Sequence, residues 1–393
     1  MSTETTNLFG LTQQELAGFF TGMGESSFRG KQLYQWLYAR GATDFATMTD
    51  LGKGLREELE RSARIAALSR VTSKSSRRDG TTKFLFALED GLTIESVLIP
   101  PARSFLGSDA ATEDEQKRLT LCISTQVGCP LDCVFCATGK MGFSRNLTTG
   151  EIVGQVLEVR RLTGKKITNV VFMGMGEPMM NYDNVMKAIE VMSTGMRIAA
   201  RRITVSTAGW ADRIRQMADE RRRAKLAVSL HSANNATRIT LMPVTKRYPL
   251  AELISAIEYY YTSTKQRVTY EYIFFDGVND SEKDVAQLVR LARRVPCKIN
   301  VIPFHSIGFT GPTGVAAGLR QSPRMERIVE HLRSNNLTVM VRSSAGEDIG
   351  AACGQLAIMS GQPSVAQAVQ PRGRSSGMRR TTIASRVPVL VPR

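Results

Sequence analysis

Three cysteines lie in one short stretch of the chain, GCPLDCVFC, at Cys129, Cys133 and Cys136. Three thiolates on one loop can bind three corners of a cubane iron–sulfur cluster and leave the fourth iron without a protein ligand. A small molecule can bind that open iron and receive an electron from the cluster. The same residues also allow a structural zinc site with Cys122 as the fourth ligand. Zinc sites usually combine two separated cysteine pairs, which these spacings do not match, so the cluster is favoured.

The spacing of the three cysteines, with the aromatic Phe135 directly before the last one, resembles the signature of the radical S-adenosylmethionine (SAM) superfamily. The resemblance implies one 4Fe–4S cluster per chain, with SAM bound to the open iron through its amine and carboxylate. Reduction would cleave SAM to a 5′-deoxyadenosyl radical, while the protein would supply binding and aim.

Glycine-rich and polar residues follow several of the apolar segments further along the chain. The turn GMGEP can bring the backbone close to a ligand, and it resembles the superfamily segment that holds the SAM amine, so we assign that role to Gly176 and Glu177. Each of the other candidates would alone be an ordinary polar group, and they gain weight from a common predicted location. These candidates for contacts with the ribose, carboxylate and adenine of SAM are Ser206, Ser229, Leu230, His231 and Asn300.

Two further cysteines, Cys122 and Cys353, are far apart in the sequence. Both are predicted at the same end of the fold, where they can act as a nucleophile and a resolving thiol. A thiolate is a good nucleophile toward an activated methyl group. The alternative is that both are ordinary buried residues, which is the interpretation we give to Cys297.

The elements that must position these residues change along the chain. Residues 1–65 predict a small helical module, with Thr12 capping its first helix, and residues 66–118 predict a β-hairpin with an inserted loop at 101–118. Seven strand-like segments between 119 and 358 alternate with helical ones, which predicts an α/β fold with a parallel sheet, either a barrel or doubly wound. Chemistry gathers at the carboxyl ends of barrel strands, where the candidate residues fall. Residues 359–393 are rich in Pro, Ser, Gly and Arg and predict a basic, disordered tail.

The formal net charge of +16 favours a polyanionic partner, most plausibly nucleic acid. No run of 18 apolar residues and no basic, apolar leader are present, so we expect no membrane segment and no signal peptide. The six cysteines are read as reduced, which predicts a cytoplasmic protein. No surplus apolar face is evident, and a monomer is expected.

The motifs together, from TLCISTQVGCPLDCVFC through VFMGMGEPMMNYDNV and LAVSLHSANN to AACGQLA, are similar to the bacterial dual-specificity RNA methyltransferases of the radical SAM superfamily. The resemblance implies a partial (β/α)6 barrel that methylates C2 of an adenine in 23S rRNA and in tRNAs, with an electron donor such as a flavodoxin or ferredoxin-type reductant. Two alternatives stay open. One is the related methyltransferase that acts on C8 of the adenine and confers antibiotic resistance, and the other is a noncatalytic iron–sulfur RNA-binding protein.

In this family reading, Cys353 takes a methyl group from one SAM, and a second SAM supplies the radical that activates it. Cys122 resolves the resulting RNA adduct and forms a disulfide with Cys353. Glu95 matches a family position proposed as a proton acceptor, although a glutamate in a strand is usually solvated. The N-terminal module and the arginine-rich segments RIAARRITV and ADERRRAKLAV are the expected RNA contacts.

Overall fold

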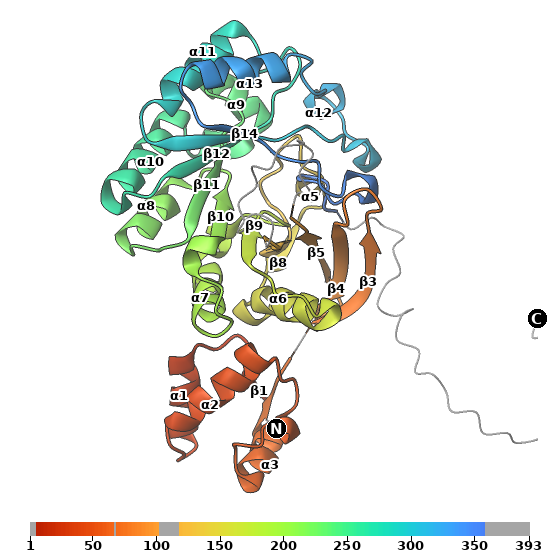
Figure 1. Ribbon diagram of the computed structural model, residues 1–393, viewed down its shortest axis with the longest axis vertical. Helices are drawn as coiled ribbons and strands as arrows, with labels where there is room; N and C mark the ends of the chain where they lie inside the picture. The colour runs from red at the N-terminus through yellow and green to blue at the C-terminus, as the bar shows by residue number, and fades with distance from the viewer. Residues whose placement is uncertain (1–4, 67, 102–117, 358–393) are drawn as a thin grey trace, which may run out of the picture.

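A computed structural model describes residues 5–66, 68–101 and 118–357 of the chain (Figure 1). The predicted tail at 359–393, and all but the ends of the predicted insert at 101–118, lie outside the described residues. None of the helices in the described part is long and apolar enough to cross a membrane.

The N-terminal module consists of three helices, α1 (Gln13–Gly22), α2 (Phe28–Tyr34) and α3 (Lys53–Ser62), and α2 continues as the π-helix η1 (Gln35–Arg40). The predicted cap is present, because the Thr12 hydroxyl accepts the Glu15 N–H at 3.2 Å while the Glu15 carboxylate accepts the Thr12 N–H at 2.8 Å. Strands β1 (Thr6–Asn7) and β2 (Ala63–Arg64) pair in parallel and bring the two ends of the module together.

One sheet of ten strands forms the body of the protein, in the order β14-β13-β12-β11-β10-β9-β6-β5-β4-β3. The three strands that come first in the chain form an antiparallel meander: β3 (Ser69–Ser75), β4 (Thr82–Ala87) and β5 (Thr93–Ile99). The turn between β4 and β5 contains Gly91, with a φ of +81°, where the residues Glu89-Asp90-Gly91 predict a hairpin turn from the sequence. The others run parallel to one another: β6 (Thr120–Cys122), β9 (Asn169–Phe172), β10 (Ile203–Thr207), β11 (Lys225–Ser229), β12 (Val268–Tyr272), β13 (Cys297–Val301) and β14 (Val339–Val341).

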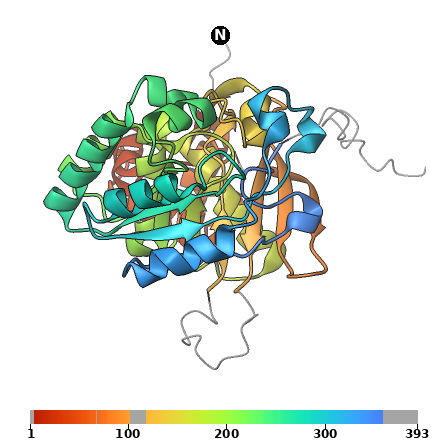
Figure 2. The same cartoon turned by 90° about the horizontal axis from the view of Figure 1, so that it is seen from above.

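Helices connect the parallel strands and lie outside the curved sheet, as the view from above shows (Figure 2). The sequence pattern predicts helices at 150–162, 183–194, 250–263 and 280–294. The corresponding helices end within two residues of these bounds: α6 (Thr149–Thr163), α7 (Tyr182–Thr194), α10 (Leu250–Thr264) and α11 (Glu282–Ala292). The remaining helices are α5 (Ala137–Lys140), α8 (Ala211–Asp219), α9 (Asn235–Leu241), α12 (Val315–Gly318) and α13 (Met325–Ser334).

Strands β3 and β14 are the two edges of the sheet, so the barrel is open, as the partial barrel predicted. The predicted six-strand unit corresponds to β6 and β9 to β13, and the short β14 adds one more parallel strand. The module packs against the outside of this barrel, where Gly10 lies so close to Gly150 of α6 that a Cβ would sit 2.4 Å from its nitrogen. Its Tyr34 hydroxyl also hydrogen-bonds to Thr194 of α7 at 2.6 Å.

Candidate active site at the carboxyl ends of the strands

The three-cysteine loop starts directly after β7 (Gln126–Gly128), which pairs with β8 (Phe143–Asn146) in a small hairpin. The Cys129 N–H donates to the Gly142 carbonyl at 2.8 Å, and the Cys136 N–H donates to the Cys133 carbonyl at 3.1 Å. Gly128 has a φ of +76°, and a Cβ there would lie 1.9 Å from the Gly142 carbonyl oxygen. The hairpin can therefore close around the cysteines only because position 128 is a glycine.

The three loop thiols face one another. Desolvation raises the pKa of the Cys133 thiol, and the neighbouring Cys136 and Cys129 raise it further. In the described ranges, no three His, Cys, Asp or Glu side chains gather closely enough to hold a single metal ion. The thiolates of a cubane cluster bind different irons, so three separate cysteines on one loop can serve as its ligands.

The electrostatic partners of Cys122 are Cys353 and Arg342 rather than the loop cysteines. These partners disfavour the zinc site with Cys122 as the fourth ligand. A set of three thiolates without a fourth fits a cluster with one open iron.

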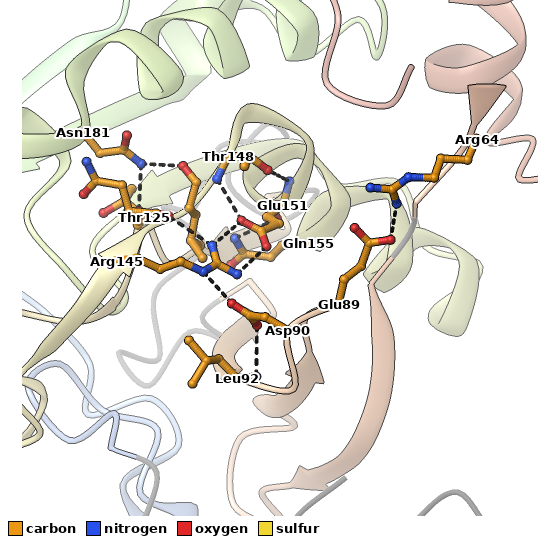
Figure 3. A network of polar contacts seen from close by, with 12 residues as sticks. Arg64, Glu89, Asp90, Leu92, Thr125, Arg145, Thr148, Glu151, Gln155 and Asn181 are labelled. Carbon is orange, nitrogen blue, oxygen red and sulfur yellow. Dashed lines mark hydrogen bonds and ion pairs between the residues drawn. The ribbon is translucent and has the colours of Figure 1, made fainter. Parts of the chain in front are cut away.

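A polar network holds the hairpin of this loop in place (Figure 3). Arg145 of β8 donates to Asp90, in the turn between β4 and β5, at 2.6 Å, and to both oxygens of Glu151 on α6 at 2.8 and 2.9 Å. The Glu151 carboxylate also accepts the Thr148 N–H that begins α6. The network connects the cysteine loop to the antiparallel meander and to the first barrel helix.

The GMGEP turn lies at the carboxyl end of β9, beside the cysteine hairpin. The Glu177 N–H donates to the Gln126 side chain at 2.8 Å, and the Glu177 carboxylate accepts the N–H groups of Ala208 at 2.7 Å and Met179 at 3.0 Å. Burial raises the pKa of Glu177 to about 7. Gly176, with a φ of +96°, packs against Gln126 so closely that a Cβ would lie 2.5 Å from its Cβ. In this arrangement the Glu177 side chain joins the ends of β9 and β10.

The other predicted SAM contacts also lie at carboxyl ends of neighbouring strands. In the register of the sheet, Ser206 pairs with Ala227, Ser229 pairs with Glu271, and Glu271 pairs with Asn300, whose amide donates to the Glu271 carboxylate at 3.0 Å. The Leu230 N–H donates to the Glu271 carbonyl at 3.0 Å, so the end of β11 is fixed against β12.

His231 is buried in a left-handed conformation, with a φ of +51°. Its Nδ1 accepts the Ile273 N–H at 3.1 Å, and its ring meets the edge of Phe135 from the cysteine loop at 4.6 Å between centroids. Burial lowers the pKa of His231 to about 3, so the ring is neutral at physiological pH. His231, which follows β11, therefore packs the end of this strand against the cysteine loop.

Arg238 of α9 was missed by the sequence analysis and is fully buried beneath this site. Its guanidinium donates to the carbonyls of Leu230 at 3.1 Å, Ala208 at 2.5 Å and Ser229 at 3.1 Å, and to the Thr245 hydroxyl at 2.7 Å. Burial lowers its pKa to about 10. No sequence motif marks this residue, because its acceptors are main-chain atoms of two separate strand ends.

Cys122 and Cys353 come together, as predicted. Burial, followed by the neighbouring Cys353, raises the pKa of Cys122 to about 12, while the positive charge of Arg342 opposes the rise. Arg342 follows β14 and forms an ion pair with the buried Glu271 at 3.6 Å. Both thiols are free, so the predicted disulfide is not present.

The segment that carries Cys353 is fastened to the three-cysteine loop. The Ala137 N–H, next to Cys136, donates to the Gly354 carbonyl at 2.7 Å, and the Thr138 hydroxyl donates to the Leu356 carbonyl at 2.6 Å. The structure therefore brings the methyl-acceptor candidate to the three-cysteine loop.

Glu95, the predicted proton acceptor, is not solvated as strand glutamates usually are, because its side chain is only 1% exposed. It faces the barrel interior opposite Lys83 of β4, whose ammonium lies 2.9 Å from Glu95 and donates to the Gly350 carbonyl at 3.1 Å. Burial raises the pKa of Glu95, and Lys83 partly offsets the rise. Lys83 was missed by the sequence analysis, and it connects Glu95 to the loop of Cys353.

Comparison with known proteins agrees with this geometry. Residues 6–65 match the family model of the ribosomal RNA large subunit methyltransferase N-terminal domain, and residues 123–289 match that of the radical SAM superfamily. The dual-specificity RNA methyltransferase RlmN of Geobacter sulfurreducens is 44% identical over 88% of this chain and 91% of its own length. The chain belongs to the RlmN family of radical SAM methyltransferases.

Two further relatives extend the RlmN match over nearly their whole length. A probable RlmN of Flavobacterium psychrophilum is 41% identical over 91% of this chain and 99% of its own. The crystal structure of a radical SAM methyltransferase from Sphaerobacter thermophilus, 40% identical, superimposes with a TM-score of 0.78 over 89% of this chain and 99% of that one. Family membership implies an RNA substrate, SAM and an iron–sulfur cluster.

Proposed function

We propose that this enzyme methylates C2 of one adenine in 23S rRNA and of an adenine in tRNAs. The observation that carries the proposal is the meeting of Cys122 and Cys353 beside the three-cysteine loop. A noncatalytic iron–sulfur protein would have no use for two paired thiols at that place. The names of the relatives, dual-specificity RNA methyltransferases, support both RNA classes.

Carbon 2 of adenine is electron-poor and carries no acidic proton, so a direct methyl transfer has no nucleophile there. A 4Fe–4S cluster held by Cys129, Cys133 and Cys136 would bind SAM at its open iron and supply the electron that cleaves it to the 5′-deoxyadenosyl radical. The main chain at Gly176 and Glu177, with Ser206, Ser229, Leu230, His231 and Asn300, would hold that SAM.

The chain's own cysteines would carry the methyl group. The Cys353 thiolate would displace the methyl group from a first SAM and become S-methylcysteine, with S-adenosylhomocysteine leaving. The S-methyl group would then lose a hydrogen atom to the radical from a second SAM and bond to C2 of the adenine. Loss of the C2 proton to Cys122 or Glu95, and return of one electron to the cluster, would leave the adenine joined to Cys353 sulfur through a methylene group. The Cys122 thiolate would then attack the Cys353 sulfur and break its bond to this methylene, which would take up a proton as the new methyl group. The resulting disulfide would need two electrons from a reductant to reopen.

The geometry assigns supporting roles to the neighbouring charges. The positive charge of Arg342 opposes the rise in the pKa of Cys122, and Lys83 holds Glu95 and the Cys353 loop in one arrangement. The N-terminal module would contribute to holding the RNA, a flavodoxin or ferredoxin-type protein would donate electrons, and the enzyme would act as a cytoplasmic monomer.

Mass spectrometry of nucleosides from rRNA and tRNA, in cells with and without this gene, tests the proposal. We expect 2-methyladenosine to disappear from both pools when the gene is absent. Unchanged 2-methyladenosine would refute the assignment, and loss of 8-methyladenosine instead would identify the C8 methyltransferase.

A further inference from the structure

The arginine-rich segments of the sequence lie at the end of the barrel opposite the active site. They precede β10 and β11, and in a parallel sheet every segment that leads into a strand reaches its amino end. The site residues described above follow the strands and lie at the carboxyl ends. A five-residue strand such as β10 separates the two ends by about 17 Å.

The loops into β9, β10 and β11 carry six exposed cations, here called the basic face: Lys165, Lys166, Arg197, Arg201, Arg221 and Arg223. Within residues 5–66, 68–101 and 118–357, none of the six forms an ion pair. Other cations of this end are neutralised, such as Arg222 by Glu220 at 2.6 Å and Arg294 by Glu258 at 2.6 Å. The charge of the basic face is therefore available to a partner.

The cations at this end of the barrel are also close to one another. Lys225, the first residue of β11, lies among Lys298, Arg118 and Arg202, which together with burial lower its pKa. Arg118 and Arg267 act in the same direction on Lys298 of β13. Like charges held close together repel one another and lower the stability of the folded protein. Proteins commonly keep such a destabilising arrangement where it serves binding.

A cavity of about 600 Å³ hollows one side of the basic face. The N-terminal module forms one wall of this cavity with residues 39–43, and the segments 160–167 and 195–198 form the others. Its basic lining residues are Arg40, Arg160, Arg161, Lys165, Lys166 and Arg197. Arg161 is paired with Glu158, and the other five cations remain to attract an anion.

We propose that the basic face binds the phosphate backbone of the RNA substrate at a distance from the adenine that enters the active site. Several unpaired cations spread over three loops and a cavity suit an extended polyanion, and phosphate contacts position an RNA without reading its sequence. The inference rests on the proposed RNA substrate. An RNA that reaches both ends must continue along the side of the barrel, so a short stem–loop that only fills the active site does not reach the basic face.

The proposal is tested by comparing how the variants bind a long RNA and a short RNA. The full-length variant with Lys166→Gln and Arg223→Gln is compared with a control carrying Lys283→Gln and Arg327→Gln, exposed cations in the first turns of the outer helices α11 and α13. Fluorescence anisotropy measures the binding of a full-length tRNA transcript and of the stem–loop cut from it, over a range of salt concentrations. Thermal unfolding and SAM cleavage without RNA verify that both variants are intact.

For the tRNA transcript we expect the test variant to lose affinity by about tenfold and its log–log salt slope to fall by roughly two, since each lost phosphate contact removes about 0.7–0.9. The stem–loop should bind both variants equally. Equal tRNA binding by test and control variants would overturn the proposal, and so would an equal loss for the stem–loop, which would place the contact next to the adenine. Because the assay needs no methyl transfer, RNA binding as expected without methylated adenine would refute only the proposed function.

Discussion

The two ends of the parallel strands differ in whether their charged side chains are buried and paired or exposed and unpaired. At the carboxyl ends, every buried charge described above has partners: Arg238 has four acceptors, Lys83 lies against Glu95, and Arg342 lies against Glu271. At the amino ends, the six cations of the basic face are exposed and form no ion pair with the described residues.

The difference follows from what each end has to do. Chemistry needs groups held in one geometry, which buried side chains with charged or hydrogen-bonding partners provide. Long-range attraction of a polyanion needs charge that no internal partner has neutralised. Substitutions at the carboxyl ends should therefore reduce catalysis or stability, and substitutions at the amino ends should reduce the affinity for RNA.

The largest expected effect is at the carboxyl ends. Cys353→Ala should abolish methylation of RNA, by at least about a thousandfold, because it removes the thiol proposed to accept the methyl group. Iron content and reductive SAM cleavage should be unchanged, since the three loop cysteines remain, and RNA affinity should be unchanged because the basic face is intact. Loss of the cluster in this variant would show that the cluster ligands have been misassigned.

The second prediction compares how much a substitution at each end changes the free energy of unfolding. Arg238→Met should lower the free energy of unfolding by about 2–5 kcal/mol, because it removes the four hydrogen bonds that the buried guanidinium donates. The matched substitution on the basic face, Arg223→Met, should change it by less than about 0.5 kcal/mol. Urea unfolding followed by circular dichroism measures both, and equal losses would contradict the contrast between the ends.

The smallest expected effect is a gain, not a loss, in the free energy of unfolding. Lys225→Gln should raise the free energy of unfolding by a few tenths of a kcal/mol at low salt, since it relieves repulsion among the cations around β11, and the gain should vanish in high salt. A lysine whose pKa is lower in the folded protein destabilises it while charged, so the cost is present at neutral pH.

That cost should disappear as the pH rises through the folded pKa toward the unfolded value, because the lysine then becomes neutral in both states. The advantage of the Lys225→Gln variant should shrink accordingly in thermal unfolding curves recorded from pH 7 to pH 10. A loss of stability at low salt would mean that the cations at this end do not repel one another.

The sequence predicts the fold well because its signals are local. The capping residues at Thr12, the turn at Gly91 and the alternation of apolar strands with helices each depend on neighbours along the chain. The cysteine loop is likewise visible, since its three residues lie within one short segment.

The parts that were missed depend on partners far away in the sequence. Lys83 donates to the Gly350 carbonyl, and Arg238 donates to the Ala208 carbonyl. The residues next to Lys83 and Arg238 in the sequence give no sign of either hydrogen bond. Burial of Glu95 was missed for the same reason. The location of the arginine-rich segments was available in principle, because segments that precede parallel strands must reach their amino ends.

The hydrogen bonds from Ala137 to Gly354 and from Lys83 to Gly350 have a consequence for biosynthesis. The three-cysteine loop leaves the ribosome long before the segment that closes over it, because domains form from the amino end as the chain is made. Until that segment arrives, the loop stays accessible to whatever delivers iron and sulfide. Maturation can thus follow the order of translation, with the proposed cluster ligands presented first and the proposed methyl-accepting thiol put in place last.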